Sequence, residues 1–395
     1  MIIGVDASNI RAGGGLTHLR EMLQASESAG YGLSTVHVWC AQSTKTRFAL
    51  ARMPWVEVHT PVALDGCLLR RRNWVRCHLD RQLQRVGVDG LLVPGGTYIG
   101  CFRPFVAFAQ NLLPFSRTEQ RREGWSVKRL RLMLLRRVQA RTFARADGVI
   151  FMSQSSEKEI VAATQQAPRR SAVVYHGVHS RFLRSPRVAR TIAECPRAKP
   201  FRWLYVSIVE PYKHQWSVVA AVGSLLRQGA KLRLDLVGPG NPKDVSKLRR
   251  SMRMADPAGE HIHYHDRVPY EEIHRYYAEA DAFIFASSCE TFGMILTEAM
   301  ASGLPIAASD RSVIREVAGD AAVYFDPEEP QDIAAVMQRL MENRELRSTL
   351  ANRAYERAQE FTWDRCAKET FRFVHEVVRK RSSAAAAGGL AGSSG

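Results

Sequence analysis

The stretch "DAFIFASSCETFGMILTEAMASGLPIAASD" (residues 281–310) decides the fold class. The apolar run at its start (281–287) predicts a buried strand, and the run at its end (303–310) predicts another. Between them, Gly293 marks a tight turn into a helix that starts near Met294 and stops at "SGLP". Strand, helix and strand in this order predict two parallel strands joined by a crossover helix.

The same strand–helix alternation runs through both halves of the chain. In the first half the predicted strands are "MIIGVDAS" (1–8), "GLLVPGG" (90–96), "FVAFAQN" (105–111), "DGVIFMS" (147–153) and "SAVVYHGV" (171–178). In the second half they are "RWLYVSIVEPYK" (202–213), "LRLDLVGPG" (232–240), "HIHYHDRV" (261–268), "DAFIFAS" (281–287), "GLPIAASD" (303–310) and "AAVYFDP" (321–327). We therefore expect an α/β protein with two Rossmann-like, doubly wound parallel-sheet domains that face each other across a cleft, with the ligand beyond the carboxyl ends of the strands.

Changes in composition place the expected boundaries. The prediction is an N-terminal Rossmann-like domain (1–185), a proline-containing linker (186–200), a C-terminal Rossmann-like domain (201–360), a helix that packs back toward the N-terminal domain (361–380) and a disordered, low-complexity tail (381–395).

Charge is divided unevenly between the two halves. The net charge is +17, with 29 Lys and Arg against 12 Asp and Glu in residues 1–190 and 27 against 27 in residues 191–395. This asymmetry predicts that the first half meets an anionic partner. The N-terminus lacks the pattern of a secretory signal, and the seven scattered cysteines are expected to be free thiols in a reducing cytoplasm.

Two glutamates, Glu290 and Glu298, flank the predicted helix start at Met294. A helix N-terminus offers N–H groups without internal acceptors and the positive end of the helix dipole, which suits a phosphate. A carboxylate can accept hydrogen bonds from the neighbouring hydroxyls of a sugar. Because two acids would repel a diphosphate, a cation is required nearby, and Lys213 after the strand "LYVSIV" is the candidate.

Spacing alone leaves other interpretations open. The two glutamates could be solvated surface acids, which are common at such a spacing. They could also be the acid and nucleophile of a glycosidase, which needs its carboxyl groups about 5–10 Å apart across a sugar ring. A pair that flanks a helix start beside a lysine favours binding of a nucleotide-sugar over hydrolysis.

The segment "SSCETFGMILTEAMASGLPIAASDRSVIREVAGDAAVYFDPEEPQDIA" is similar to the E-x7-E region of family-4 retaining glycosyltransferases, which have the GT-B fold. "LYVSIVEPYKHQWSVVAAV", "LVGPG" and "YHDRVPYEEIHRYYAEADAFIFAS" resemble further parts of the family's C-terminal domain, and "FTWDRCAKETFRFVHEV" resembles its closing helix. "GVDASNIRAGGGLTHL", "AQNLLPF", "FMSQSSEKEI" and "VVYHGV" resemble its N-terminal domain more loosely, since that domain binds the variable acceptor.

The resemblance implies a role for each matching residue. Glu290 would hold the hydroxyls of the donor sugar, Glu298 those of the ribose, and Lys213 would neutralise the departing diphosphate. The other residues implied in donor binding are Phe292, Gly293, Met294 and Ile295 through their backbone N–H groups, Gly14 and Gly15 in the first glycine loop, Gly238 in "LVGPG", and Arg267 and Val268 after the strand that ends in "HDR".

Two positions depart from the family pattern. Relatives often have an arginine where this chain has Ser207, so the leaving group would depend on Lys213, the helix N-terminus and Arg267. Many relatives also have a histidine where this chain has Asn111, a candidate catalytic residue that would orient the acceptor or the donor sugar.

No cofactor or metal is expected. The histidines His18, His176 and His214 lack the spacing of metal ligands, and no Asp-x-Asp-like pair stands in a plausible metal position.

The basic run "SRTEQRREGWSVKRLRLMLLRRVQARTFAR" (116–145) suggests the nature of the acceptor. Val127, Leu130, Leu134 and Val138 fall on one helical stripe that we expect to face the core, with cations around the rest of the helix. We therefore predict a cytoplasmic enzyme that binds the anionic inner face of the membrane and extends a lipid-linked bacterial surface polysaccharide or lipopolysaccharide.

Two alternatives remain. One is a transferase for a soluble acceptor, of the glycogen- or disaccharide-forming type. The other is a basic nucleic-acid-binding protein, although no recognition helix or aromatic–basic RNA signature is present and no nucleic-acid partner is expected.

Overall fold

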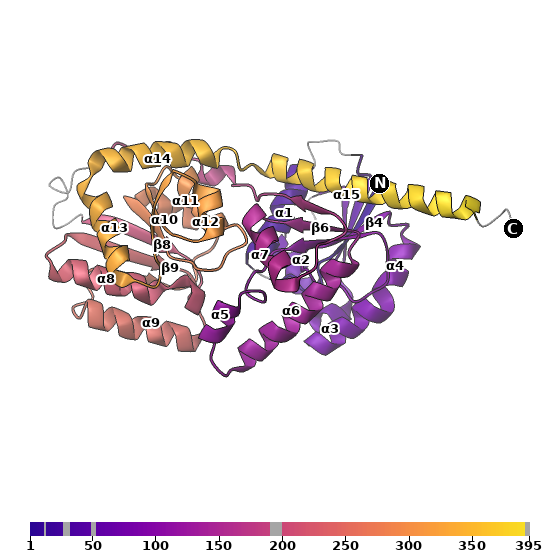
Figure 1. Ribbon diagram of the computed structural model, residues 1–395, viewed down its shortest axis with the longest axis horizontal. Helices are drawn as coiled ribbons and strands as arrows, with labels where there is room; N and C mark the ends of the chain where they lie inside the picture. The colour runs from indigo at the N-terminus through magenta and orange to yellow at the C-terminus, as the bar shows by residue number, and fades with distance from the viewer. Residues whose placement is uncertain (12, 27–31, 49–52, 190–199, 392–395) are drawn as a thin grey trace. The chain divides into compact units, whose positions relative to one another are not determined.

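The computed structural model describes the chain except residues 12, 27–31, 49–52, 190–199 and 392–395, and it falls into two compact units (Figure 1). Unit 1 comprises Met1–Phe115, Trp125–Gly177 and Trp363–Gly395, and unit 2 comprises Ser116–Gly124 and Val178–Thr362. The predicted linker 186–200 lies largely outside the described residues.

Within its described residues, unit 1 is built on a parallel sheet with the strand order β3-β2-β1-β4-β5-β6-β7. The strands are β1 (Ile2–Asp6), β2 (Thr35–Trp39), β3 (Val56–His59), β4 (Gly90–Val93), β5 (Phe105–Ala109), β6 (Gly148–Phe151) and β7 (Ser171–Val173). The α-helices are α1 (Gly14–Ser26), α2 (Gln42–Phe48), α3 (Leu68–Trp74), α4 (Asp80–Arg85), α6 (Val127–Arg145), α7 (Gln154–Thr164) and α15 (Trp363–Ala391), with the shorter turns η2 (Val62–Asp65) and η3 (Val75–Leu79).

The described part of unit 2 has a second parallel sheet, in the order β10-β9-β8-β11-β12-β13. Its strands are β8 (Phe201–Val206), β9 (Leu232–Val237), β10 (Ile262–His265), β11 (Ala282–Phe285), β12 (Ile306–Ser309) and β13 (Ala322–Phe325). Its helices are α5 (Arg117–Arg122), α8 (Gln215–Arg227), α9 (Pro242–Ala255), α10 (Ile273–Glu279), α11 (Met294–Ala301), α12 (Ser312–Ala318), α13 (Pro330–Glu342) and α14 (Arg344–Ala358), with the turns η4 (Ser180–Phe182) and η5 (Pro211–Lys213).

Both sheets are doubly wound. In each sheet, the chain first adds strands on one side of a central strand and then adds the remaining strands on its other side. This reversal lies between β1 and β4 in unit 1 and between β8 and β11 in unit 2. Right-handed crossovers in two directions place helices on both faces of a sheet, as Figure 1 shows for each unit. The predicted fold class, α/β with two Rossmann-like parallel-sheet domains, is confirmed.

The strand predictions are confirmed for unit 2 and for five strands of unit 1, while β2 and β3 were missed. Most of the predicted strands are buried apolar runs, as expected of parallel strands covered on both faces, whereas the edge strands β7 and β10 are only partly buried. The two missed strands have the sequences "TVHVW" and "VEVH", in which polar residues alternate with valines. They form one side of the sheet, where β3 is the edge strand.

The C-terminal helix α15 packs on unit 1. Phe373 and Val377 of α15 lie so close to Gly148 in β6 that a Cβ atom at this glycine would be 2.7 Å from the Phe373 ring. Helical structure continues to Ala391, although the sequence analysis expects disorder from residue 381. Alanine has the highest helix propensity of all residues, so the alanines of the tail are compatible with a continued helix.

The orientation predicted for the helix over 125–145 is wrong. In α6 the side chains of Val127, Leu130 and Leu134 are exposed. The buried side chains of this helix are Leu132, Gln139, Thr142 and Phe143. The buried side includes polar residues with partners, since the Thr142 hydroxyl accepts a hydrogen bond from the Tyr98 N–H at 3.1 Å. The spacing of apolar residues in the sequence does not reveal a buried helix side that contains polar residues.

The expectation that the cysteines are free thiols is confirmed for the described residues. The cysteines in the described part of the chain, Cys40, Cys67, Cys77, Cys101, Cys289 and Cys366, are free thiols. The seventh, Cys195, lies outside the described residues. Among the described helices none has both the length and the apolar character needed to cross a bilayer.

The orientation of α6 predicts a large loss of stability when one of its leucines is replaced and almost none when another is replaced. Leu132→Ala should lower the free energy of unfolding by about 2–4 kcal/mol because it leaves a cavity in the core. Leu130→Ala should change it by less than about 0.5 kcal/mol because this side chain is already exposed. Urea denaturation followed by circular dichroism measures both, and a larger loss for Leu130→Ala would contradict the orientation.

Candidate active site

The reversal of strand order in unit 2 brings together the loops that follow β8 and β11. These two strands are neighbours, and their carboxyl ends lie at the same edge of the sheet. The loop after β8 leads into η5, which ends at Lys213. The loop after β11 carries Glu290 and leads into α11. Topology therefore places the two predicted residues side by side.

Lys213 and Glu290 form an ion pair between Lys213 Nζ and Glu290 Oε1. The side chain of Lys213 is 6% exposed and that of Glu290 is 16% exposed. Lys213 Nζ also lies 4.8 Å from the ring centre of Tyr212 and 5.4 Å from that of Phe285. Aromatic faces attract a cation, so these rings help to hold the ammonium group where a diphosphate could reach it.

The start of α11 has the geometry expected of a phosphate-binding turn. Gly293 adopts φ +92°, a left-handed conformation that favours glycine. Met294 and Ile295 are the first helical residues, whose N–H groups have no acceptor within the helix. Phe292 is buried and packs edge-on against Phe361, which fixes the turn on its inner side.

Glu298 lies one turn into α11 and is 4% exposed. Its carboxyl oxygens accept hydrogen bonds from the Tyr270 hydroxyl at 2.9 Å and from the Tyr277 hydroxyl at 3.1 Å. Burial raises the pKa of Glu298 to about 7, although the two tyrosine hydrogen bonds and the charge of Arg181 oppose this shift. The predicted ribose-binding acid is thus inside unit 2 and already hydrogen-bonded.

The other donor-binding candidates of unit 2 lie at the ends of β9 and β10. Gly238 follows β9 with φ +137°, and a Cβ atom there would be 2.2 Å from the carbonyl oxygen of Ser207. This close approach requires glycine, and it brings the loops after β8 and β9 together. Arg267 is exposed and Val268 is half-buried in the loop that follows β10.

The three candidates in unit 1 also lie close to one another. Gly14 and Gly15 are the first residues of α1. A Cβ atom on Gly15 would be 3.1 Å from the side-chain oxygen of Gln110, the residue before Asn111. The Asn111 side chain accepts a hydrogen bond from the Leu113 N–H at 3.1 Å. The structure therefore brings the glycine loop after β1 next to the loop after β5.

The histidines near this loop are core residues. The rings of His18 and His176 are 4.4 Å apart and both are buried. Burial lowers the pKa of His18 well below its usual value, and it lowers the pKa of His176 to about 3. Both imidazoles are therefore neutral at physiological pH.

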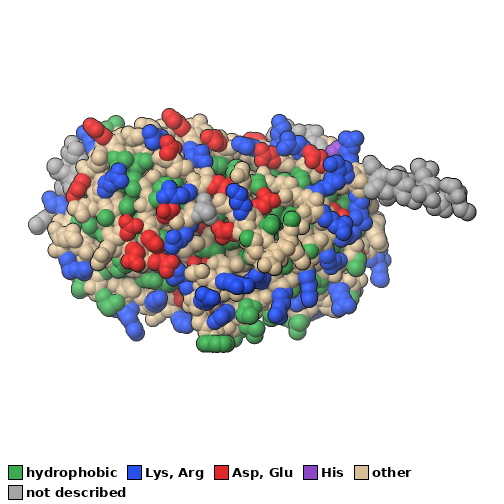
Figure 2. Space-filling view, viewed as in Figure 1, with side chains coloured by type: hydrophobic (Ala, Val, Ile, Leu, Met, Phe, Trp, Pro, Cys, Tyr) green, Lys and Arg blue, Asp and Glu red, His purple; other side chains and the backbone are tan. Residues whose placement is uncertain are grey.

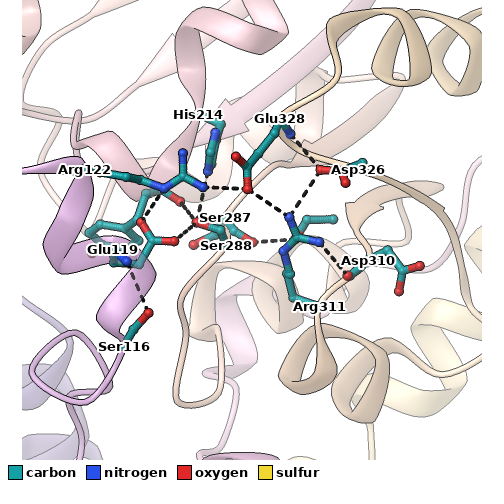
Figure 3. A network of polar contacts seen from close by, with 12 residues as sticks. Ser116, Glu119, Arg122, His214, Ser287, Ser288, Asp310, Arg311, Asp326 and Glu328 are labelled. Carbon is teal, nitrogen blue, oxygen red and sulfur yellow. Dashed lines mark hydrogen bonds and ion pairs between the residues drawn. The ribbon is translucent and has the colours of Figure 1, made fainter.

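A polar network that the sequence analysis missed lies next to Ser288, two residues before Glu290 (Figure 3). Glu119 of α5 is buried and accepts a hydrogen bond from the Ser288 hydroxyl at 2.7 Å. Arg122 pairs with Glu119 at 3.1 Å and with Glu328 at 2.5 Å. The network thus holds α5 against the loop that carries Glu290.

The network continues on its other side to His214 and Arg311. His214 Nε2 lies 3.0 Å from the Ser288 hydroxyl oxygen, and Arg311 pairs with Glu328 at 3.3 Å. Burial, with a further contribution from Arg122, lowers the pKa of His214 to about 4, so this imidazole is neutral near pH 7. Ser116 and Glu119 have the Ser-x-x-Glu spacing of a helix start, which signals α5 but not its partners.

Comparisons with known proteins find similarity to glycosyltransferases. The family model described as "Glycosyl transferases group 1" matches residues 194–357, which confirms the predicted resemblance for that part of the chain. A D-inositol 3-phosphate glycosyltransferase of Nocardioides sp. is 28% identical over 57% of this chain and 52% of its own length. An O-antigen chain mannosyltransferase B of Escherichia coli is 28% identical over 46% of this chain and 50% of its own length.

The chain therefore spans about half the length of the curated relatives that it matches. Among solved structures, Anabaena HepE in complex with UDP and glucose aligns with 97% of this chain and 100% of its own, at a TM-score of 0.68 and 18% identity. This likeness shows a shared fold, the GT-B architecture of glycosyltransferases.

The burial of Glu298 predicts a pH-dependent stability. The pKa of this group rises from 4.5 to about 7 on folding, so its contribution to stability is fully present below about pH 4.5 and is lost as the pH rises through about 7. Glu298→Gln removes the titration, and its stability relative to the parent should increase by on the order of 3 kcal/mol between pH 4.5 and pH 8. Thermal unfolding at both pH values, with the exposed Glu329→Gln as a control, measures this difference, and an equal effect at both pH values would contradict the burial.

Proposed function

Because residues 194–357 match the family model of group 1 glycosyl transferases, we propose that this protein is a retaining glycosyltransferase. It transfers a sugar from a nucleotide-diphosphate donor to a lipid-linked glycan acceptor in the synthesis of a bacterial surface polysaccharide or lipopolysaccharide. The observation that carries the proposal is the Lys213–Glu290 ion pair at the start of α11, beside the strand-order reversal of unit 2.

The site can bind a diphosphate and a sugar at once. A diphosphate at the start of α11 would meet the N–H groups of Met294 and Ile295 and the ammonium group of Lys213. When phosphate oxygens compete for Lys213, the Glu290 carboxylate can turn to the hydroxyls of the sugar. The complex of HepE with UDP and glucose, which shares the fold, supports a nucleotide-diphosphate donor.

The residues of this site act by positioning and by electrostatic stabilisation. In the transfer, the bond between the anomeric carbon and the phosphate oxygen breaks, and the diphosphate leaves with the electron pair. The acceptor oxygen bonds to the same carbon, and the proton of the acceptor hydroxyl is taken up by the departing diphosphate. Lys213 and the N-terminus of α11 stabilise the charge that develops on the diphosphate. Retention is proposed from the family resemblance, with no metal required.

Unit 1 offers positive charge for an anionic acceptor. Arg71 of α3 donates to the Ser8 carbonyl at 3.4 Å, at the end of β1. Burial, together with the neighbouring Arg11 and Arg131, lowers the pKa of Arg71, which indicates that these guanidinium groups lie close together. Like-charged groups gathered at the carboxyl end of a parallel strand suit a phosphate-bearing acceptor.

The outward side of α6 supports a membrane-bound acceptor. We define the α6 surface as the exposed apolar residues Trp125, Val127, Leu130, Met133 and Leu134 together with Lys128, Arg131, Arg137 and Arg141. Figure 2 shows apolar and basic side chains together along the lower margin, where α6 and α3 lie. Exposed apolar residues among cations fit the interface of an anionic bilayer, at about 1 kcal/mol for each nearby cation. We accordingly propose a location at the inner face of the cytoplasmic membrane.

Loss of the cation at the diphosphate should reduce turnover. Lys213→Ala is expected to lower kcat by about 100- to 1,000-fold, because the leaving group loses a preorganised positive charge. Turnover is measured as release of nucleoside diphosphate from UDP-, GDP- and dTDP-sugars. Lys231→Ala, an exposed lysine of the same unit, is the matched control. Unchanged kcat in a folded Lys213→Ala protein would contradict the proposed site.

A thermal-shift comparison separates the transferase from the nucleic-acid-binding alternative. The cognate nucleotide-sugar should raise the Tm of the parent protein, and Glu290→Ala should reduce this shift because the sugar loses a hydrogen-bond acceptor. Single-stranded DNA should leave the Tm unchanged. Stabilisation by DNA and by none of the nucleotide-sugars would overturn the proposed function.

The α6 surface predicts binding to anionic vesicles. Replacing Trp125, Val127 and Leu130 with alanine should weaken co-sedimentation with phosphatidylglycerol vesicles by about tenfold, because the insertion of apolar area is lost. Met254→Ala in α9 is the control, since Met254 is also exposed. Equal and salt-insensitive binding of the parent protein to phosphatidylcholine vesicles would contradict the electrostatic part of the proposal.

A further inference from the structure

Two histidines and a glutamate converge on one face of the sheet of unit 1. In the parallel register of β2 and β3, His37 is paired with Glu57, and Trp39 is paired with His59. Paired residues of parallel strands, and residues two apart on one strand, point to the same face. His37, Glu57 and His59 therefore lie together near the edge of the sheet, where β3 is the outermost strand.

Two of the distances within this cluster are close to those between the ligands of one metal ion. His37 Nδ1 is 3.0 Å from His59 Nε2 and 3.4 Å from Glu57 Oε2. One ligand atom from each residue lies within 4.8 Å of the other two. Ligands at about 2.0–2.1 Å from a tetrahedral zinc ion are about 3.4 Å from one another. A cation could thus be held with only small movements of the three side chains.

Burial and charge also suit a cation. His37 is buried, whereas the Glu57 side chain is 60% exposed, so the cluster has one side open for entry and for a water ligand. Within the described part of the chain, Glu57 forms no ion pair with a lysine or arginine. Among the described side chains, the Glu57 carboxylate lies 3.4 Å from His37 Nδ1, and it can supply negative charge to a cation.

The rings are held in place before any ion binds. Trp39 stacks on His59, with ring centres 4.8 Å apart and planes inclined by 16°. The His37 and His59 ring centres are 5.3 Å apart, with planes inclined by 21°. Fixed ligands lose little conformational freedom on binding, which favours affinity.

From this juxtaposition we propose that His37, Glu57 and His59 form a binding site for Zn²⁺ that ties the edge strand β3 to β2. Two imidazoles and a carboxylate are a ligand set that zinc accepts, with water in the fourth position. We assign no reaction to the ion, whose role is to hold β3 against β2. The site lies within the sheet of unit 1 and uses none of the residues assigned to sugar transfer, so its failure and that of the proposed function are separable.

Zinc binding is tested with the full-length protein by equilibrium dialysis and metal analysis. The parent protein should bind one equivalent of Zn²⁺ and show a higher Tm in its presence, because the ion binds the folded state alone. His37→Gln and His59→Gln should each weaken binding by about 100-fold, and Glu57→Gln by about tenfold. His78→Gln, an exposed histidine of η3 in the same unit, should bind as the parent does.

A spectroscopic measurement on the parent protein covers the case in which a histidine variant fails to fold. One equivalent of Cu²⁺ should give an electron paramagnetic resonance spectrum with coupling to two nitrogen atoms, as expected for two imidazole ligands. A spectrum without two nitrogen ligands would overturn the proposal. Zinc affinity unchanged in a folded His59→Gln protein, or no stoichiometric binding by the parent, would also overturn it.

Discussion

The ion pair between Lys213 and Glu290 is the interaction on which the candidate site depends. Both side chains are largely buried, and an ammonium or carboxylate group left alone in such a place would cost several kcal/mol. Each charge therefore fixes the position of the other. The pair exists because the strand order reverses between β8 and β11, which brings two loops distant in sequence to the same point. A diphosphate that displaces Glu290 from Lys213 would give the ammonium group a new charge partner, while the Glu290 carboxylate would take hydrogen bonds from the sugar hydroxyls in its place.

A strand could be predicted from the sequence where burial on both faces of the sheet makes it a continuous apolar run. In unit 2 the edge strand β10 ("IHYH") was predicted although it is not such a run, so the rule applies best to the centre of both sheets. It fails for β2 and β3, where alternate residues are polar. The alternation that conceals these strands also places His37, Glu57 and His59 on a common face. The polar residues that interrupt the apolar pattern of β2 and β3 are therefore the ones that could bind a metal ion.

The existence of α6 was predictable from sequence, but its orientation was not. Its buried side contains Gln139 and Thr142 as well as leucine and phenylalanine, while several apolar residues point outward. A polar residue can be buried without a large penalty when it has a hydrogen-bond partner, and the partner of Thr142 is the backbone of Tyr98, distant in sequence. Apolar periodicity carries no information about such partners. The resulting outward side combines apolar and basic side chains, and this composition is the basis of the proposed contact with a membrane.

Both glutamates were identified from the sequence. The residues that surround them come from other segments, which the spacing between the two glutamates does not indicate. Glu290 faces an ammonium group, whereas Glu298 faces the hydroxyls of Tyr270 and Tyr277, which belong to segments at least 21 residues earlier. Because the pKa of Glu298 is about 7, its carboxyl group is partly protonated at physiological pH. An ionised carboxyl group only accepts hydrogen bonds, while a protonated one also donates. If Glu298 holds ribose hydroxyls, as the family resemblance implies, donor binding must be coupled to the ionisation of this carboxyl group. Glu290 would then act as a charge partner of Lys213 and Glu298 as a titrating hydrogen-bonding group.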